Sequence, residues 1–184
     1  MRIPNGVDTE QFRPATPEER TQLRQKLHAA KNKVMLLTVG TVNYTKGLDT
    51  LLKAIFELED DIKQHIRLWV VGPMSNRDSA GKVQEGFEEY VDKVKRMIDE
   101  FGLQSIVQFR GRQGNVDEYM RAADIYIHPS RQEGQPNAIL EAMATGLPVV
   151  ANLLPGITDE ILQAGRCGYL VNVEDKSQFA ASLR

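Results

Sequence analysis

Short apolar runs alternate with longer helical patterns along most of this chain, and no other feature constrains its fold as strongly. Five runs are expected to form strands, over residues 34–39, 66–71, 106–109, 125–127 and 149–151. Several are apolar almost throughout, which is typical of strands covered on both faces. Helices are expected over residues 17–30, 47–58, 87–101, 116–122 and 136–144. The alternation predicts right-handed crossovers and an α/β fold with a Rossmann-like, doubly wound parallel sheet.

Four small residues mark the edge of this sheet where a ligand would bind. Ligands of doubly wound sheets lie outside the carboxyl ends of the strands. Gly40, Gly72, Gly111 and Ser130 each follow a predicted strand within a few residues. All four are therefore expected at that edge.

Length and charge narrow the class of protein. The 184 residues allow one well-buried domain, taken here as residues 1–184. A net charge of −2 argues against nucleic-acid binding, which requires a basic surface. The lone Cys167 cannot form an internal disulfide, so a reducing, cytoplasmic setting is expected. No apolar run approaches the length of a membrane span.

Both ends of the sequence resemble cut ends. Residues 3–8 read as a turn with no strand before it, and residues 175–184 read as a helix interrupted midway. We therefore expect a fragment, one domain of a longer protein.

The segment 133–141 places Glu133 and Glu141 on either side of a predicted helix start. Pro136 suits the first helical turn, because its fixed φ matches the helix and its missing N–H would be unpaired there anyway. The start of a helix carries roughly half a positive charge and is a natural seat for phosphate oxygens. The N–H groups expected to point outward belong to Asn137, Ala138 and Ile139.

The two glutamates are unlike a matched acid–base pair. One precedes the helix and the other lies more than a turn inside it, so we interpret them as separate hydroxyl binders flanking an anion site. Such a site suits a phosphorylated sugar or a nucleotide sugar. Taken only as two acids, an ordinary loop acid and a solvated helix residue are the alternative. The preceding residues 128–130, with Gly134 and Pro136, make the segment more specific.

The loop 40–47 is the second candidate. It leaves a buried strand, has Gly40 at its turn and carries Lys46 at a helix start. Lysine can act as a point charge on a phosphate, and glycine lets a ligand approach the backbone. A solvated lysine beside a loop glycine remains the alternative.

Together, several stretches resemble the C-terminal, donor-binding half of retaining GT-B glycosyltransferases of family four, the group 1 glycosyl transferases. They are residues 3–8 with Phe12, 39–47, 70–72, 107–111 and 123–141, extended by 146–151. The resemblance implies one half of a GT-B fold, with a nucleotide-diphosphate sugar as donor and no metal ion or other cofactor. It implies glycan biosynthesis, and an absent N-terminal domain that supplies the acceptor site and any membrane attachment.

The resemblance also implies roles for single residues. Glu133 would contact the hydroxyls of the transferred sugar and, with Lys46, form the catalytic pair, while Glu141 would contact the ribose. Lys46 would also bind the diphosphate, and the backbone around Arg112 would face the base. Further donor-binding residues are expected to be Gly40, Thr41, Gly72, Gly134, Gln135, Pro136, Asn137, Ala138 and Ile139.

One departure from the family pattern concerns the first loop. Many members carry an arginine beside its glycine or near its lysine, where this chain has Thr41 and Thr45. Arg131 could substitute for it, and an exposed loop arginine is the other interpretation. The departure bears on donor affinity and donor identity.

Neighbouring residues leave smaller questions open. His128 could face the sugar or pack, and Asp124 could bind local backbone N–H groups. The loop 155–160, which leads into a short helix at the ligand edge, could contact the donor; Thr158 as the N-cap of that helix is the alternative.

Three other functions compete with sugar transfer. A non-catalytic nucleotide-sugar or sugar-phosphate binding module would fit the missing arginine. A GT-B sugar epimerase does not usually carry the glutamate segment. A dehydrogenase is poorly supported, because no Gly-x-Gly-x-x-Gly follows the first strand.

Overall fold

The computed structural model describes residues 5–74 and 86–184, so the first two residues of the 3–8 stretch lie outside the described part. Six parallel strands form one sheet in the order β3-β2-β1-β4-β5-β6. This order reverses between β1 and β4, which is the switch point of a Rossmann-like sheet. The strands are β1 (Val34–Val39), β2 (Ile66–Val71), β3 (Val107–Gly111), β4 (Ile125–His128), β5 (Val149–Asn152) and β6 (Tyr169–Val171).

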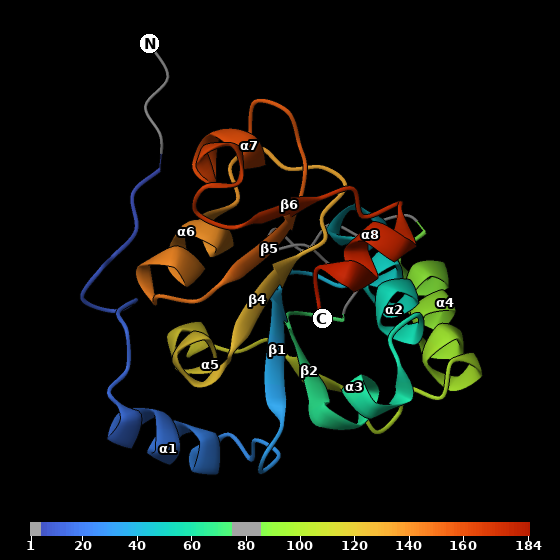
Figure 1. Cartoon of the computed structure of the whole chain (residues 1–184), viewed down its shortest axis with the longest axis horizontal. Helices are drawn as coiled ribbons and strands as arrows, with labels where there is room; N and C mark the ends of the chain where they lie inside the picture. The colour runs from blue at the N-terminus through green and yellow to red at the C-terminus, as the bar shows by residue number, and fades with distance from the viewer. Residues whose placement is uncertain (1–4, 75–85) are drawn as a thin grey trace.

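Helices cover both faces of the sheet (Figure 1). On one face α2 packs between α4 and α8, and on the other α5 packs between α1 and α6. Their bounds are α1 (Pro17–Lys26), α2 (Leu48–Phe56), α3 (Asp60–His65), α4 (Phe87–Glu100), α5 (Val116–Ala122), α6 (Asn137–Ala144), α7 (Thr158–Ile161) and α8 (Lys176–Ala181). Two short 3₁₀ turns are η1 (Tyr44–Lys46) and η2 (Gln163–Gly165). The doubly wound α/β fold predicted from the sequence is confirmed.

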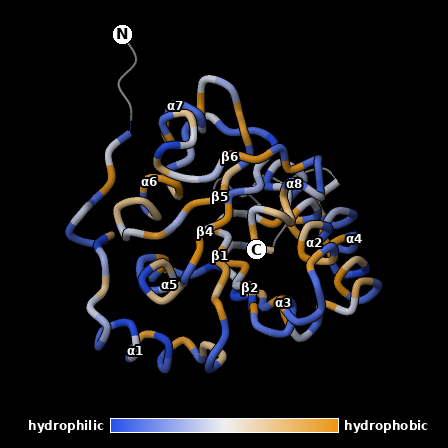
Figure 2. Tube along the Cα trace, viewed as in Figure 1, coloured by the Kyte–Doolittle hydropathy of each residue, from blue (hydrophilic) through white to orange (hydrophobic). Residues whose placement is uncertain are grey.

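The core consists of two apolar layers, one on each face of the sheet. Successive strand residues point to opposite faces. Thus Leu36 and Leu68 pack with α2 and α4, whereas Leu37 and Trp69 pack with α5 and α6. Figure 2 shows apolar residues concentrated in the central strands. Burial on both faces explains why these strands are apolar almost throughout.

The boundaries of several elements differ from the prediction for local reasons. Helix α1 begins with a capping box between Thr16 and Glu19, but ends at Lys26 instead of residue 30, since His28 has a φ of 53°. Helix α2 begins after Gly47, whose φ is 66°. Helix α6 begins at Asn137, and Pro136 is its N-cap instead of its first residue. The short elements α3 and β6 were not predicted.

Candidate functional site

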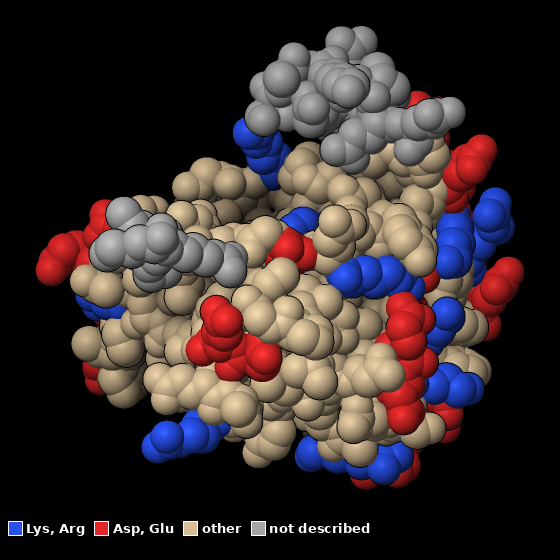
Figure 3. Space-filling model, turned by 90° about the horizontal axis from the view of Figure 1, so that it is seen from above, with Lys and Arg blue, Asp and Glu red and all other residues tan. Residues whose placement is uncertain are grey.

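Two loops that are distant in the sequence meet at the carboxyl ends of β1 and β4. A Cβ on Gly47 would lie 2.1 Å from the carbonyl oxygen of Pro129, so the two backbones touch. The N–H of Arg131 donates to the carbonyl of Thr45 at 2.8 Å. Figure 3 looks onto this edge and shows an acidic and a basic group beside a hollow near its middle. The two candidate loops therefore form one surface.

Glu133 lies at the junction of these loops and is held by two side chains. Nζ of Lys46 donates to Oε1 of Glu133 at 2.6 Å. Nε2 of His128 lies 3.0 Å from the same oxygen. The side chain of Glu133 is 9% exposed, whereas that of Lys46 is 33% exposed. The structure thus brings together the two residues predicted to be catalytic.

The surroundings of Glu133 keep it ionised. Burial by itself would raise the pKa of this carboxyl, but the hydrogen bonds from His128 and Lys46 outweigh it and lower the pKa to about 2. At neutral pH the group is therefore a carboxylate that accepts hydrogen bonds. It is not a proton donor.

A chain of polar contacts runs from Glu133 through His128 to Tyr126. The hydroxyl of Tyr126 lies 3.0 Å from Nδ1 of His128, and both side chains are buried. Burial, followed by the charges of Glu133 and Glu141, raises the pKa of Tyr126, so its hydroxyl keeps its proton. A Tyr126 hydroxyl that donates to Nδ1 leaves the proton of a neutral His128 on Nε2, which then donates to Glu133. His128 therefore orients the carboxylate of Glu133 through this hydrogen bond. The sequence had left open whether His128 faces the sugar or packs.

The first turn of α6 presents fewer open N–H groups than predicted. Pro136 adopts φ −78° and ψ 88°, and its carbonyl accepts a hydrogen bond from the N–H of Ile139 at 3.0 Å. The expectation of an open N–H on Ile139 was therefore wrong, and its side chain is fully buried. Within the described residues, the main-chain N–H groups of Asn137 and Ala138 have no hydrogen-bond partner. The side chain of Asn137 accepts a hydrogen bond from Asn5 at 2.7 Å.

Glu141 lies one turn inside α6 in different surroundings. Burial raises the pKa of its carboxyl. Among residues 5–74 and 86–184, no side chain or N–H group donates to this carboxylate. Glu141 is thus half-buried without a hydrogen-bond donor among the described residues.

The glycines Gly40 and Gly72 end neighbouring strands, and their backbones are in contact. Their φ angles are 152° and 151°, and a Cβ on Gly72 would lie 1.9 Å from the carbonyl oxygen of Gly40. A Cβ on Gly40 would lie 3.3 Å from Cδ of Lys46. Both glycines therefore make room for the chain and for Lys46. Thr41 follows on the same loop and is partly exposed, and the donor contacts of all three stay predictions.

The remaining predicted residues lie around the same edge. Gly134 and Gln135 line a groove of about 430 Å³ together with Leu140 and Ile157. Arg112 is exposed on the loop after β3. Their roles in donor binding also stay predictions.

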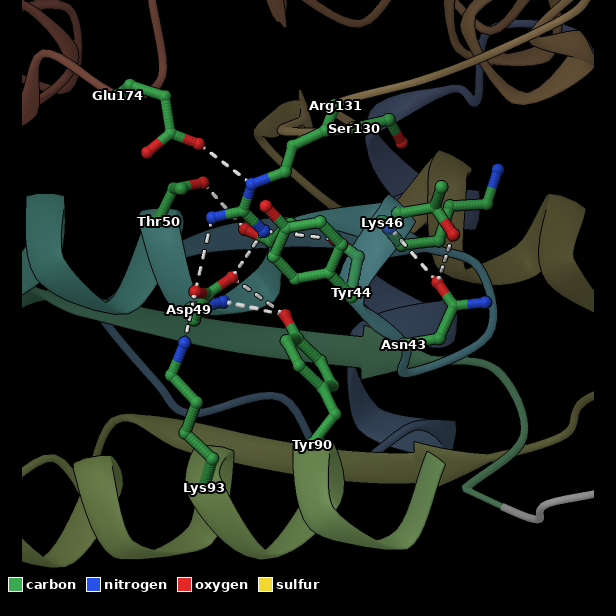
Figure 4. A network of polar contacts seen from close by, with 12 residues as sticks. Asn43, Tyr44, Lys46, Asp49, Thr50, Tyr90, Lys93, Ser130, Arg131 and Glu174 are labelled. Atoms are coloured by element: carbon green, nitrogen blue, oxygen red, sulfur yellow. Dashed lines mark hydrogen bonds and ion pairs between the residues drawn. The ribbon is translucent and has the colours of Figure 1, made fainter. Parts of the chain in front are cut away.

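Arg131 is not an exposed loop residue and does not replace the missing arginine. Its side chain is 14% exposed and pairs with Asp49, which is 1% exposed, at 2.7 Å (Figure 4). A second ion pair joins it to Glu174 at 2.7 Å. Sequence reasoning missed Asp49, although an acid flanked by the apolar residues of α2 was a usable signal.

Asp124 and Thr158 also differ from expectation. Asp124 accepts from the N–H of Met35 on β1 at 2.7 Å and pairs with Arg20 and Arg24 of α1, so its partners are not local. Thr158 is fully buried and is the first residue of α7, whose N-cap is Ile157. Its hydroxyl donates to the carbonyl of Asn152 at 2.6 Å, so Thr158 is not the N-cap. Gly156, Ile157 and Glu160 of the same loop line the groove beside Gly134, and a donor contact there stays a prediction.

The described residues contain no group of three or more His, Cys, Asp or Glu side chains able to hold a metal ion. No helix in the same residues has the length and apolar character needed to cross a membrane.

Comparison with known proteins identifies relatives of the chain. The model of the family described as glycosyl transferases group 1 matches residues 19–184. D-inositol 3-phosphate glycosyltransferase of Geodermatophilus obscurus is 31% identical over 187 residues, which cover 99% of this chain and 39% of that protein. Lipopolysaccharide glucosyltransferase WaaG of Escherichia coli K12 is 28% identical, with coverage of 92% and 41%. The chain therefore spans about two fifths of the length of these relatives.

Solved structures show the same fold. Anabaena Alr3699/HepE in complex with UDP and glucose has a TM-score of 0.81 and 25% identity, over 97% of this chain and 45% of that one. The C-terminal domain of a glycosyl transferase group 1 family protein (LpcC) from Francisella tularensis has a TM-score of 0.77 and 27% identity, over 97% and 86%. The six-stranded sheet is thus that of one domain of a GT-B glycosyltransferase.

Proposed function

The chain belongs to the glycosyl transferases group 1 family, and from this premise we propose that it is the donor-binding domain of a retaining glycosyltransferase. The full protein transfers a sugar from a nucleotide-diphosphate sugar to an acceptor, in the cytoplasm and in the service of glycan synthesis. The observation that carries this proposal is the Lys46–Glu133 pair at the carboxyl edge of the sheet, because Glu133 lies in the loop that leads into the first turn of α6.

The donor's diphosphate is proposed to bind Lys46 and the N–H groups of Asn137 and Ala138. These two N–H groups have no partner in the described residues, and anions favour helix N-termini. Lysine carries three N–H donors, so Lys46 can bond a phosphate oxygen while it remains paired with Glu133. When the glycosidic bond breaks, negative charge grows on the departing nucleoside diphosphate. The fixed cation and the helix N-terminus stabilise that charge electrostatically, and the proposal includes no metal ion or cofactor.

The sugar and ribose are proposed to bind the two glutamates. A carboxylate has about four acceptor positions, so Glu133 can accept from sugar hydroxyls in addition to Lys46 and His128. Glu141 would accept from the ribose hydroxyls, which would supply the donors that the described residues do not. The backbone around Arg112 would face the base. The transferred sugar develops oxocarbenium character, which nearby oxygen atoms support.

A non-catalytic nucleotide-sugar binding module is the second candidate. Thr41 and Thr45 occupy the positions where many family members have an arginine, and Arg131 is engaged by Asp49 and Glu174. Lower positive charge around the diphosphate would weaken leaving-group stabilisation more than it would alter the shape of the pocket.

Calorimetry of the 184-residue chain with UDP, GDP and ADP tests donor binding. We expect heat with at least one nucleotide and little sugar transfer, because the acceptor half is absent. No heat with any of the three would overturn the assignment of the site. In the full-length protein, release of UDP from UDP-glucose with acceptor present would support the enzyme; binding without release, for every donor bound, would support the module.

A further inference from the structure

Arg131 is bonded to both loops that form the candidate site. Its main chain belongs to the loop that carries Glu133. Its Nη1 donates to the carbonyl of Tyr44 at 3.0 Å, and its N–H donates to the carbonyl of Thr45 at 2.8 Å. Its guanidinium also lies over the ring of Tyr44, 4.4 Å from the centroid. Tyr44, Thr45 and Lys46 form the η1 turn, so Arg131 contacts the turn that ends in the candidate cation.

The far side of the guanidinium is anchored to the protein core through Asp49. Nη1 and Nη2 of Arg131 donate to the two oxygens of Asp49 at 2.7 and 3.2 Å, a bidentate geometry (Figure 4). Asp49 also accepts from the hydroxyl of Tyr90 and from Nζ of Lys93, each at 2.8 Å. Burial would raise the pKa of Asp49, but these three partners hold it well below its usual range. The anchor is therefore an ionised, fully paired carboxylate.

The candidate site depends on the position of Lys46 more than a site with a second cation in this loop would. Lys46 ends the η1 turn, which is capped by Asn43 and followed by the left-handed Gly47. Where the family often has a second cation, this loop has threonines. A displacement of the turn would move Lys46 away from Glu133, and small displacements of a positioned charge cost much of its effect.

We propose that Arg131 is a positioning residue: its fork on Asp49 and its bond to the Tyr44 carbonyl hold the Lys46 turn against Glu133. Its effect on donor binding rests on the proposed function, whereas its effect on the Lys46–Glu133 pair does not. Arg131 itself is placed on no ligand.

The test compares Arg131→Ala and Arg131→Lys with Arg121→Ala. Arg121 pairs with Asp117 on α5 at 2.7 Å and its side chain is 16% exposed, so it offers a partly buried ion pair on the other face of the sheet as a control. Arg131→Lys keeps the positive charge but loses the planar fork. Three quantities are measured: the melting temperature, the pKa of the Glu133 carboxyl by carbon-13 NMR, and the dissociation constant for UDP.

The charged and titratable groups around Glu133 are Lys46 on η1, and His128 and Tyr126 on β4, with Glu141 acting on Tyr126. In both Arg131 variants, we expect the Glu133 pKa to rise by about one pH unit as Lys46 moves away. UDP affinity should fall about tenfold. Arg121→Ala should lower the melting temperature and leave both other quantities unchanged.

The outcomes distinguish failure of the positioning role of Arg131 from failure of the proposed donor site. A Glu133 pKa unchanged in Arg131→Lys would overturn the positioning role, since a simple loss of charge is excluded in that variant. Should Arg131→Ala fail to fold, Arg131→Lys carries the same test. If no variant or parent chain binds UDP while the Glu133 pKa still rises, the positioning role stands and the donor site fails.

Discussion

Glu133 and Glu141 flank the same helix start, yet their surroundings are opposite. Glu133 receives hydrogen bonds from Lys46 and His128, and its pKa is lowered to about 2. Glu141 receives no bond from any described residue, and burial raises its pKa. The described residues thus donate hydrogen bonds to one carboxylate and none to the other. The first is suited to hold a fixed orientation and the second to gain binding free energy when a hydroxyl arrives.

The largest expected effect comes from Glu133→Ala in the full-length protein. Loss of a fixed carboxylate at the sugar should slow transfer by about 100-fold or more, as removal of a preorganised electrostatic group does elsewhere. UDP affinity should stay within about threefold, because Arg131 still holds the Lys46 turn. Single-turnover rates with saturating donor measure the first quantity and calorimetry the second. A full transfer rate would remove Glu133 from the catalytic pair.

The contact between the loops predicts the next effect. Gly47→Ala should destabilise the chain by about 2–3 kcal/mol, since its φ is 66° and the new Cβ would lie 2.1 Å from the Pro129 carbonyl. Gly134→Ala is the matched control. No atom of the described residues lies within 4 Å of a Cβ built there, and its φ lies outside the left-handed region. Urea unfolding measures the free energy of unfolding of both variants. Equal values would mean that the two loops are not packed as described.

Glu141→Ala should weaken binding of UDP to the isolated chain by about tenfold, or about 1.4 kcal/mol. The cause would be the loss of acceptors for the ribose hydroxyls at a carboxylate to which no described residue donates. Calorimetry with UDP measures it, and uracil alone, which lacks the ribose, serves as the control ligand. Unchanged affinity for UDP would remove Glu141 from the nucleotide site and leave the contrast between the two acids purely structural.

The fold and the outline of the site follow from local patterns, whereas the linkages within the site do not. Apolar runs with glycines after them locate the strand ends, and Pro136 locates the start of α6 to within one residue. By contrast, Lys46 and Glu133 are 87 residues apart, and Arg131 and Asp49 are 82 apart. Such pairs depend on how the two loops pack, which no periodicity encodes. The bond of the Ile139 N–H depends on the ψ of Pro136, a local angle that the residue type leaves open.

The smallest expected effect concerns the stability of the chain without ligand. Glu141→Gln should raise the free energy of unfolding at pH 7 by about 0.5 kcal/mol, because it removes a charge that burial disfavours. Since the folded-state pKa of Glu141 lies above its unfolded value, its contribution to stability is full at low pH and is lost as pH rises through the folded pKa. The gain from the substitution should therefore vanish on acidification. Urea unfolding at several pH values measures it.

Glu133→Gln provides the opposite sign and completes the contrast. The pKa of Glu133 is lowered from 4.5 to about 2, so its stabilisation is present above the higher value and is lost as pH falls through the lower one. Glu133→Gln should therefore destabilise the chain at pH 7, with a difference from the parent that shrinks between these two pH values. The two substitutions are isosteric and remove the same charge eight positions apart, so opposite pH slopes can arise only from the surroundings of each carboxylate. Parallel slopes would mean that the two carboxylates share one electrostatic environment, and the division of roles between them would fail.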